Sequence, residues 1–134
     1  MKLVINEAAQ CVGCRQCELI CSLKHEKSFS PWLARIHVRR DENIVLSEPI
    51  ICRQCPDAPC MAACPVGAIL QSEATGAYYV DSVECVGCMQ CVEACPYQAL
   101  VFDSETGSVK KCDVCGGQPA CIDVCPAQVL KLEV

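Results

Sequence analysis

The sequence predicts a small α+β fold in which short helices and β-hairpins surround an unusual number of cysteine side chains. The chain has 134 residues, enough for one or two small domains, and 16 of them are cysteine, several times the usual share. The hydrophobic fraction of 52% includes these cysteines, so few ordinary core side chains remain for a chain of this size. We therefore expect bonds made by the cysteines, in addition to side-chain packing, to hold the fold together.

The cysteines fall into four groups of four with nearly the same spacing. The first and third groups read C-x2-C-x2-C-x3-C, the second widens the middle gap to four residues, and the fourth widens it to five. This is the run of bacterial ferredoxins, in which three cysteines bind one 4Fe-4S cluster and the fourth binds another. The sequence thus predicts four 4Fe-4S clusters. Their predicted ligands, group by group, are Cys11, Cys14, Cys17 and Cys21; Cys52, Cys55, Cys60 and Cys64; Cys85, Cys88, Cys91 and Cys95; and Cys112, Cys115, Cys121 and Cys125.

Other uses of cysteine fit this spacing less well. Eight disulfides would require an oxidising compartment, whereas the first residues lack the apolar stretch and the cleavage site of a signal peptide, so we expect a cytoplasmic protein. Zinc ribbons separate two C-x2-C pairs by a dozen or more residues, whereas here a third and a fourth cysteine follow closely. A cluster with a substrate-binding iron would leave one cysteine ligand missing, and every group here has four.

Two stretches, residues 64–80 and 95–111, repeat each other with a period of 31 residues. Each begins with Cys-Pro and contains a Thr-Gly pair, Thr75-Gly76 in one and Thr106-Gly107 in the other. Apolar residues on both sides of such a pair predict two short strands joined by a tight turn, the helix-and-hairpin unit of a ferredoxin half. The short helices are expected around residues 17–24, 61–64, 89–95 and 120–125.

Both ends of the chain are also predicted to form strands, at residues 3–5 and 129–132. If these strands pair, residues 1–50 and 110–134 form an outer ferredoxin-like module that interlocks with an inner module of residues 51–109. If they do not pair, two ferredoxin-like modules follow each other in tandem.

One insertion, residues 22–51, separates the first two cysteine groups. Within it, the alternating basic residues of 35–40 and the apolar residues 44–46 flank Asp-Glu-Asn at 41–43, which predicts a hairpin with a solvated face. Aromatic residues make up only 4% of the chain, and we expect Trp32 to pack in the core beside a cluster rather than in an interface.

Charge and motif content narrow the function. The net charge of -5 at pH 7 argues against nucleic-acid binding, and no apolar run is long enough to span a membrane. Because no G-x-G-x-x-G loop, P-loop or nucleophile-and-base constellation is present, we expect a non-catalytic protein whose partners are proteins. His25 and His37 are expected to be lone surface histidines. The cations beside the cysteine groups, which either tune cluster potentials or are simply solvated surface charges, are Arg15, Arg53, Lys110 and Lys111.

The four groups, in this order, resemble the four-cluster iron-sulfur subunits of the dimethyl sulfoxide reductase type. Such subunits also serve formate dehydrogenases, hydrogenases, carbon monoxide dehydrogenases and tungsten-dependent oxidoreductases. The compact form looks most like the small subunits that accompany tungstopterin aldehyde oxidoreductases and related benzoyl-CoA reductase complexes. In this family, long insertions and a C-terminal membrane-anchoring helix are common, whereas this sequence stops just after its last predicted strand.

The resemblance implies an electron-transfer subunit with four 4Fe-4S clusters. It would carry single electrons between a catalytic subunit, best guessed as a tungsto- or molybdopterin aldehyde oxidoreductase, and an external carrier such as ferredoxin or another redox subunit. Alternatives are a benzoyl-CoA reductase, hydrogenase, formate or carbon monoxide dehydrogenase complex, or self-association of the chain into a conductive scaffold.

The resemblance also implies how the groups share clusters, because family members pair the first group with the fourth and the second with the third. A tandem arrangement would instead exchange fourth ligands between groups one and two and between groups three and four. The implied sets are Cys11, Cys14, Cys17 and Cys125; Cys112, Cys115, Cys121 and Cys21; Cys52, Cys55, Cys60 and Cys95; and Cys85, Cys88, Cys91 and Cys64.

Overall fold

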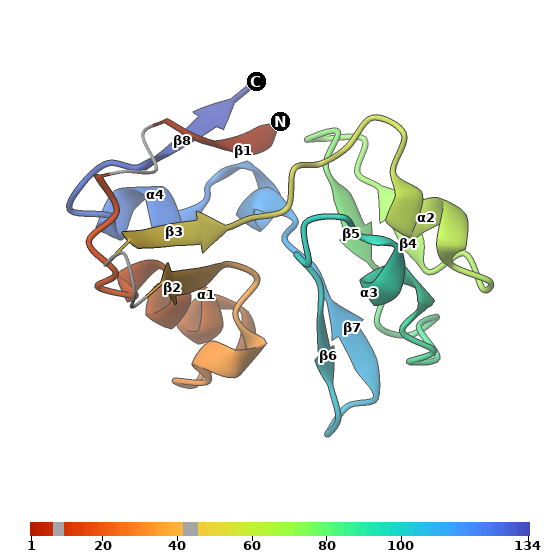
Figure 1. The fold of residues 1–134 in the computed structure, drawn as a ribbon. Helices are drawn as coiled ribbons and strands as arrows, with labels where there is room; N and C mark the ends of the chain where they lie inside the picture. Colours follow the sequence, from red (N-terminus) through yellow and green to blue (C-terminus); the bar gives the residue numbers. More distant parts are fainter. Residues whose placement is uncertain (7–9, 42–45) are drawn as a thin grey trace.

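The structure, a computed structural model, describes residues 1–6, 10–41 and 46–134, and it shows short helices and small antiparallel sheets (Figure 1). Within these ranges the predicted combination of short helices and hairpins is confirmed, and each sheet has two strands. The α-helices are α1 (Gln16–Glu26), α2 (Pro59–Ala63), α3 (Gln90–Ala94) and α4 (Ala120–Val124), and the 3-10 helices are η2 (Pro31–Leu33) and η3 (Val114–Gly117).

Proline decides where three of the α-helices end. Helices α2, α3 and α4 each stop directly before Cys64, Cys95 and Cys125, and each of these cysteines precedes a proline. A residue before proline is pushed from helical to extended backbone, and all three cysteines have φ near -75° and ψ between 111° and 117°. Cys21 is followed by serine, so α1 continues past it for another turn to Glu26.

The internal repeat forms two equivalent hairpins. Strand β4 (Ile69–Gln71) pairs with β5 (Tyr78–Val80), and β6 (Val101–Asp103) pairs with β7 (Ser108–Lys110). In both turns the glycine has a positive φ, and its N–H donates to a carbonyl four residues earlier: Gly76 to Ser72 and Gly107 to Asp103, each at 2.8 Å. The predicted Thr-Gly hairpins are therefore confirmed, with glycine supplying the left-handed conformation.

The hairpin predicted in the insertion is also present. Strand β2 (His37–Asp41) pairs with β3 (Leu46–Ile50), so that His37 faces Ile50 across the sheet. The predicted turn lies outside the described residues, except for Asp41, which ends β2.

The two ends of the chain meet in one sheet. Strand β1 (Lys2–Ile5) runs antiparallel to β8 (Leu130–Glu133), with Leu3 opposite Leu132, which confirms the predicted terminal strands. Helix α1 packs on α4, and α2 packs on α3. Figure 1 shows α4 beside the β1–β8 sheet, α1 beside β2, and the second helix pair beside the β4–β5 hairpin. These contacts favour residues 1–50 with 110–134 as one module around residues 51–109, a division that we retain as a proposal.

Cysteine contributes to both buried cores. The larger core contains Leu3, Ile36, Ile51, Val114 and Leu130 together with five buried cysteines. The smaller core combines two buried cysteines with Ile69, Leu100 and Val109. Each core is too small to bury much apolar area without its thiols, as the lean composition predicts.

The expectation that Trp32 packs in the core is wrong. Its side chain is 68% exposed, and that of the neighbouring Phe29 is 67% exposed. The 3-10 turn η2 interrupts the strand-like alternation ahead of β2, so that Ala34, Ile36 and Val38 fill the interior instead. Two large aromatic side chains are thereby left on the surface of the insertion.

The pairing of the chain ends can be tested at Leu3, which is 2% exposed. Replacing Leu3 with alanine should lower the free energy of unfolding by about 2 to 5 kcal/mol, because a buried leucine leaves a cavity. Thermal denaturation of anaerobically prepared protein, followed by circular dichroism, measures the loss. As a control, Leu70→Ala changes a side chain that is 38% exposed and should cost less than half as much, and equal losses would contradict the structure.

Candidate iron-sulfur sites

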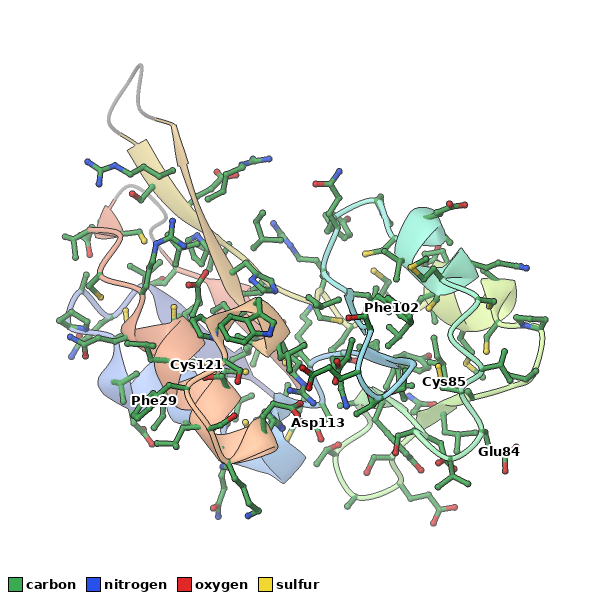
Figure 2. The ribbon with its side chains drawn as sticks, turned by 90° about the horizontal axis from the view of Figure 1, so that it is seen from below. Phe29, Glu84, Cys85, Phe102, Asp113 and Cys121 are labelled. Atoms are coloured by element: carbon green, nitrogen blue, oxygen red, sulfur yellow. The ribbon has the colours of Figure 1, made fainter. Side chains whose placement is uncertain are left out.

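All of the predicted ligands lie in the described part of the chain, and none of these cysteines forms a disulfide there. Seven of the sixteen thiols are buried and only Cys14 and Cys88 are exposed. Figure 2 shows sulfur atoms gathered in both halves of the molecule, with Cys121 in one and Cys85 in the other.

Four cysteines from two different groups line one cavity. Cys52, Cys55 and Cys60 of the second group face Cys95 of the third around this cavity. The same wall includes Lys111. The fold thus brings the fourth cysteine of one group to the first three cysteines of its neighbour.

A second cavity shows the reciprocal exchange. Cys85, Cys88 and Cys91 of the third group line this cavity together with Cys64 of the second. The pKa of Cys91 is raised to about 11, mainly by burial; the N–H of Val92 opposes this rise, and the charges of Cys85 and Cys64 contribute to it. Both sets are those implied by the resemblance, while the binding of a cluster to them stays a prediction.

The first and fourth groups meet between α1 and α4. Burial raises the pKa of Cys121 to about 12, and nearby Cys115, Cys21 and Cys17 add to the shift. Cys21 thus lies close to the thiols of the fourth group, as the nested arrangement requires. For the set that joins Cys125 to the first group, the supporting observations are the packing of α1 on α4 and the pairing of β1 with β8.

The buried thiols suit a strongly positive ligand. Burial raises the pKa of Cys17 to about 12 and also raises that of Cys112, because a thiolate without water is costly. Iron ions favour the deprotonated form and release the proton on binding. Thiolate sets of this kind are the usual ligands of iron-sulfur clusters, so the residues fit the cofactor.

Backbone N–H groups point at sulfur in a repeated pattern. The N–H of Gln54 donates to Cys52 Sγ and that of Val114 donates to Cys112 Sγ, both at 3.5 Å. Gln54 and Val114 have positive φ values of 48° and 52°. This rarely occupied conformation turns the amide inward, toward the first sulfur of each group.

The fourth cysteines repeat a different pattern. Cys64, Cys95 and Cys125 each accept a hydrogen bond from the N–H four residues later, at 3.2, 3.5 and 3.4 Å. Burial acts to raise the pKa of Cys64, but the N–H groups of residues 66–69 outweigh it and lower that pKa. At Cys64 the backbone donors of the Cys-Pro turn therefore stabilise the thiolate.

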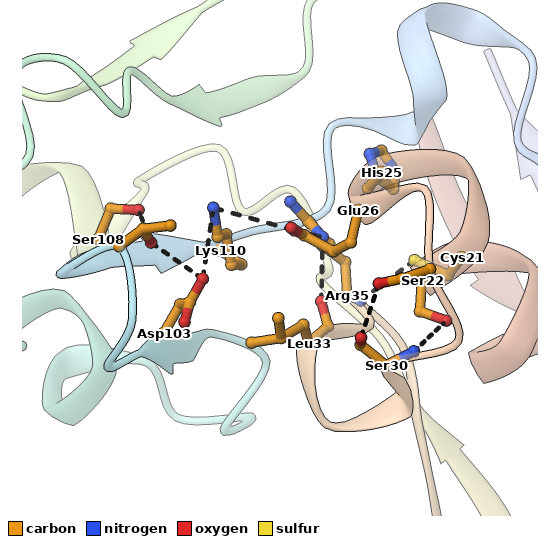
Figure 3. A network of polar contacts seen from close by, with 12 residues as sticks. Cys21, Ser22, His25, Glu26, Ser30, Leu33, Arg35, Asp103, Ser108 and Lys110 are labelled. Carbon is orange, nitrogen blue, oxygen red and sulfur yellow. Dashed lines mark hydrogen bonds and ion pairs between the residues drawn. The ribbon is translucent and has the colours of Figure 1, made fainter.

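Cys21 lacks a following proline and uses a distant donor instead. The N–H of Arg35 reaches Cys21 Sγ at 3.1 Å. The guanidinium of Arg35 donates to Glu26 at 2.7 Å and to the Leu33 carbonyl at 3.0 Å, which fixes this segment (Figure 3). The role of Arg35 has no local sequence signal, because its partner lies fourteen residues earlier.

His25 is not the surface histidine that the sequence predicts. Its side chain is 17% exposed, and its Nε2 lies 3.6 Å from Cys115 Sγ and 4.0 Å from Asp113 Oδ1. Burial and the charge of Arg35 lower the pKa of His25, against the opposing effect of Asp113. A neutral imidazole can donate a hydrogen bond to the sulfur. His37 is also partly buried, with a 27% exposed side chain.

Comparison with known proteins identifies the family. The model of the 4Fe-4S dicluster domain matches residues 43–134, which include the second, third and fourth cysteine groups. The chain belongs to the 4Fe-4S dicluster family. Members of this family are ferredoxin-like electron-transfer proteins, so the predicted iron-sulfur chemistry is confirmed at that level.

Relatives of this dicluster chain include subunits of oxidoreductases. It is 43% identical over 116 residues to the "Aliphatic sulfonate oxidoreductase, polyferredoxin-like subunit" of Pyrococcus furiosus, covering 87% of this chain and 66% of that one, just under two thirds. It is 38% identical to the "Electron transport protein HydN" of Escherichia coli K12, covering 96% of this chain and 86% of that one. It spans only 21% of another relative, the "Putative oxidoreductase UacF" of the same bacterium.

Solved structures show a similar fold. A chain from the "Active site complex BamBC of Benzoyl Coenzyme A reductase as isolated" matches with a TM-score of 0.56 at 26% identity, covering 96% of this chain and 74% of that one. Among the described residues of this dicluster chain, no helix is long and apolar enough to cross a membrane.

Gly87, in the loop of the third cysteine group, lies close to the β6–β7 hairpin, and this packing can be tested. A Cβ added there would lie 2.4 Å from the Gly107 carbonyl oxygen and 3.1 Å from the Phe102 ring. Gly87→Ala should therefore push the loop off the β6–β7 hairpin and lower the iron content of protein purified anaerobically. The matched control is Gly67→Ala, which also has a positive φ but nothing within 4 Å, so it should keep its iron at a cost of about 1 to 2 kcal/mol. Equal iron in both variants would contradict this packing.

Proposed function

We propose that the chain is a non-catalytic electron-transfer subunit that holds four 4Fe-4S clusters. It passes single electrons between a catalytic oxidoreductase subunit and an external carrier, such as ferredoxin or a further redox subunit. The observation that supports this most directly is the pair of reciprocal cavities, each lined by three cysteines of one group and the fourth cysteine of the other. When bound, the clusters would supply the one-electron chemistry.

We assign all sixteen cysteines as ligands in the nested arrangement. In this assignment every iron has a thiolate, which leaves no open coordination position for a substrate. The sets, in order along the molecule, are Cys11, Cys14, Cys17 and Cys125; Cys112, Cys115, Cys121 and Cys21; Cys52, Cys55, Cys60 and Cys95; and Cys85, Cys88, Cys91 and Cys64.

Each proposed module has one place where a redox partner can come close to a cluster. Cys14 and Cys88 are the exposed cysteines of the first and third groups. Val12 is 68% exposed near one of them, and Val86 is 65% exposed near the other. Apolar surface beside a ligand lets a partner dock and exclude water, so the two sites are suited to electron entry and exit.

For the catalytic partner we propose a tungsto- or molybdopterin enzyme of the aldehyde oxidoreductase type, with a benzoyl-CoA reductase complex as the alternative. Two similarities support an oxidoreductase partner: the sulfonate oxidoreductase subunit of Pyrococcus furiosus and the chain from the active-site complex of benzoyl coenzyme A reductase. Co-purification of tungsten or molybdenum with the chain from its own host is the decisive check.

Iron analysis of double variants tests the cluster count and the nested assignment together. The wild type should contain about sixteen irons per chain, four for each cluster. Replacing Cys11 and Cys125 with serine removes ligands of a single nested cluster, so about twelve irons should remain. Replacing Cys11 and Cys64 removes ligands of two clusters, so about eight should remain.

The tandem arrangement predicts the opposite ranking for these two variants. In that arrangement Cys11 and Cys64 share a cluster, whereas Cys11 and Cys125 do not. More iron in the variant that lacks Cys11 and Cys64 would therefore overturn the nesting. Zinc in place of iron in the wild type would overturn the proposed function itself.

The exposed aromatic residues of the insertion allow a test of how the chain docks to its catalytic subunit. Trp32→Ala should weaken the complex with the catalytic subunit by about 2 kcal/mol, which is roughly a thirtyfold higher Kd, because tryptophan is a common interface anchor. Iron content should stay unchanged, since Trp32 is 68% exposed. Leu70→Ala serves as the control at another exposed apolar position, and analytical ultracentrifugation measures the complex. Loss of iron without loss of binding would show that Trp32 has a packing role.

A further inference from the structure

Lys111 is a buried cation at the boundary between the two proposed modules. Its side chain directly follows β7, and the residue is only 6% exposed. Its ammonium lies 3.0 Å from Cys52 Sγ, 3.1 Å from the Tyr78 carbonyl, 3.3 Å from the Cys112 carbonyl and 3.4 Å from Gln54 Oε1. Lys111 is therefore not a solvated surface charge. Its ammonium contacts a cysteine of the second group and the backbone of the fourth.

Gln54 holds this ammonium in place. Its Nε2 donates to the Cys112 carbonyl at 2.8 Å, and its Oε1 accepts the N–H of Tyr78 at 2.7 Å. The side chain is itself buried, at 8% exposure. We call this set of five residues, Cys52, Gln54, Tyr78, Lys111 and Cys112, the Lys111 junction.

The neighbouring lysine provides the contrast. Successive side chains on a strand point to opposite faces, and Lys110 faces α1, where it lies 3.9 Å from Glu26 and 4.0 Å from Asp103 (Figure 3). Two carboxylates therefore offset its charge. The partners of Lys111 are a sulfur and neutral oxygen atoms, and within the described ranges no carboxylate forms an ion pair with it.

A buried cation without a carboxylate partner acts strongly on its surroundings, because the low dielectric of the interior screens it little. Adding an electron to a cluster adds negative charge, which a nearby cation stabilises, so the reduction potential rises. The contact to Cys52 directs this effect to the cavity lined by Cys52, Cys55, Cys60 and Cys95.

We propose that Lys111 raises the reduction potential of the cluster held by Cys52, Cys55, Cys60 and Cys95. This shift moves the electron distribution toward that cluster and away from its neighbour across the Lys111 junction, which is held by the set containing Cys112. Lys111 thus acts through its charge, and it makes this cluster easier to reduce than it would be without the lysine. This inference rests on the proposed function, since it requires the clusters to be present.

The test is a redox titration of the purified, cluster-containing chain followed by electron paramagnetic resonance. In Lys111→Met, the ratio of reduced to oxidised cluster at a fixed potential should fall at least tenfold, which corresponds to about 59 mV for a one-electron couple. Cys52→Ser identifies the affected signal, because it removes a ligand of the same cluster and the signal of that cluster should disappear. The other clusters should change less.

Two further variants distinguish the effect of the Lys111 charge from the effect of changing its side chain. Lys111→Arg keeps the charge, so the ratio of reduced to oxidised cluster at the same fixed potential should stay within a factor of a few of the wild-type ratio. Lys131→Met removes the same charge from an exposed position on β8 and should leave every potential unchanged. If Lys111→Met retains its iron and no potential shifts, or if Lys131→Met produces the same shift, the inference is wrong.

A measurement on the wild type covers the case in which Lys111→Met fails to assemble. In protein carrying nitrogen-15 at the lysine side chains, pulsed electron paramagnetic resonance should detect a lysine nitrogen coupled to the reduced cluster. Absence of that coupling would overturn the inference even with full iron content. A wild-type chain without iron would instead overturn the proposed function, so the two failures are distinguishable.

Discussion

The sharing of cysteines between neighbouring groups is the constraint on which the rest of this structure depends. In each inner cavity, three thiols come from one group and the fourth comes from the next. Because neither site is complete without the other, α2 must lie beside α3, and the hairpins that follow these helices are brought into place with them. The ordinary apolar core is small, so this exchange replaces much of the packing on which a larger core would rely.

Buried thiolates lose the stabilisation that water gives them, and backbone N–H groups replace part of it. Non-glycine residues such as Arg15, Gln54 and Met89 adopt positive φ values in the cysteine loops, at a cost of about 1 to 2 kcal/mol each. In return, amides in these loops and after the Cys-Pro turns point at sulfur. Side chains add to this: the ammonium of Lys111 donates to Cys52 as well, and the imidazole of His25 contacts Cys115.

Much of the local structure follows from short sequence signals. The Cys-Pro pairs predict where three helices end, and the Thr-Gly pairs predict both hairpins of the repeat, because proline and glycine restrict or permit backbone conformations directly. The exposure of Trp32 and the burial of Lys111 and His25 were not predictable in this way. Each depends on which segment of the fold lies against the residue, and composition gives no information about that.

Sequence by itself determined the donor chemistry of this protein: the thiols, their local spacing, and the turns that present them within each group. Only the tertiary structure decided which fourth cysteine meets which three, and which lysine becomes buried beside sulfur. The physical reason is range, since backbone preferences act over a few residues, whereas the contact of Lys111 with Cys52 spans 59 residues of chain. Such contacts exist only when the helices and hairpins have packed together.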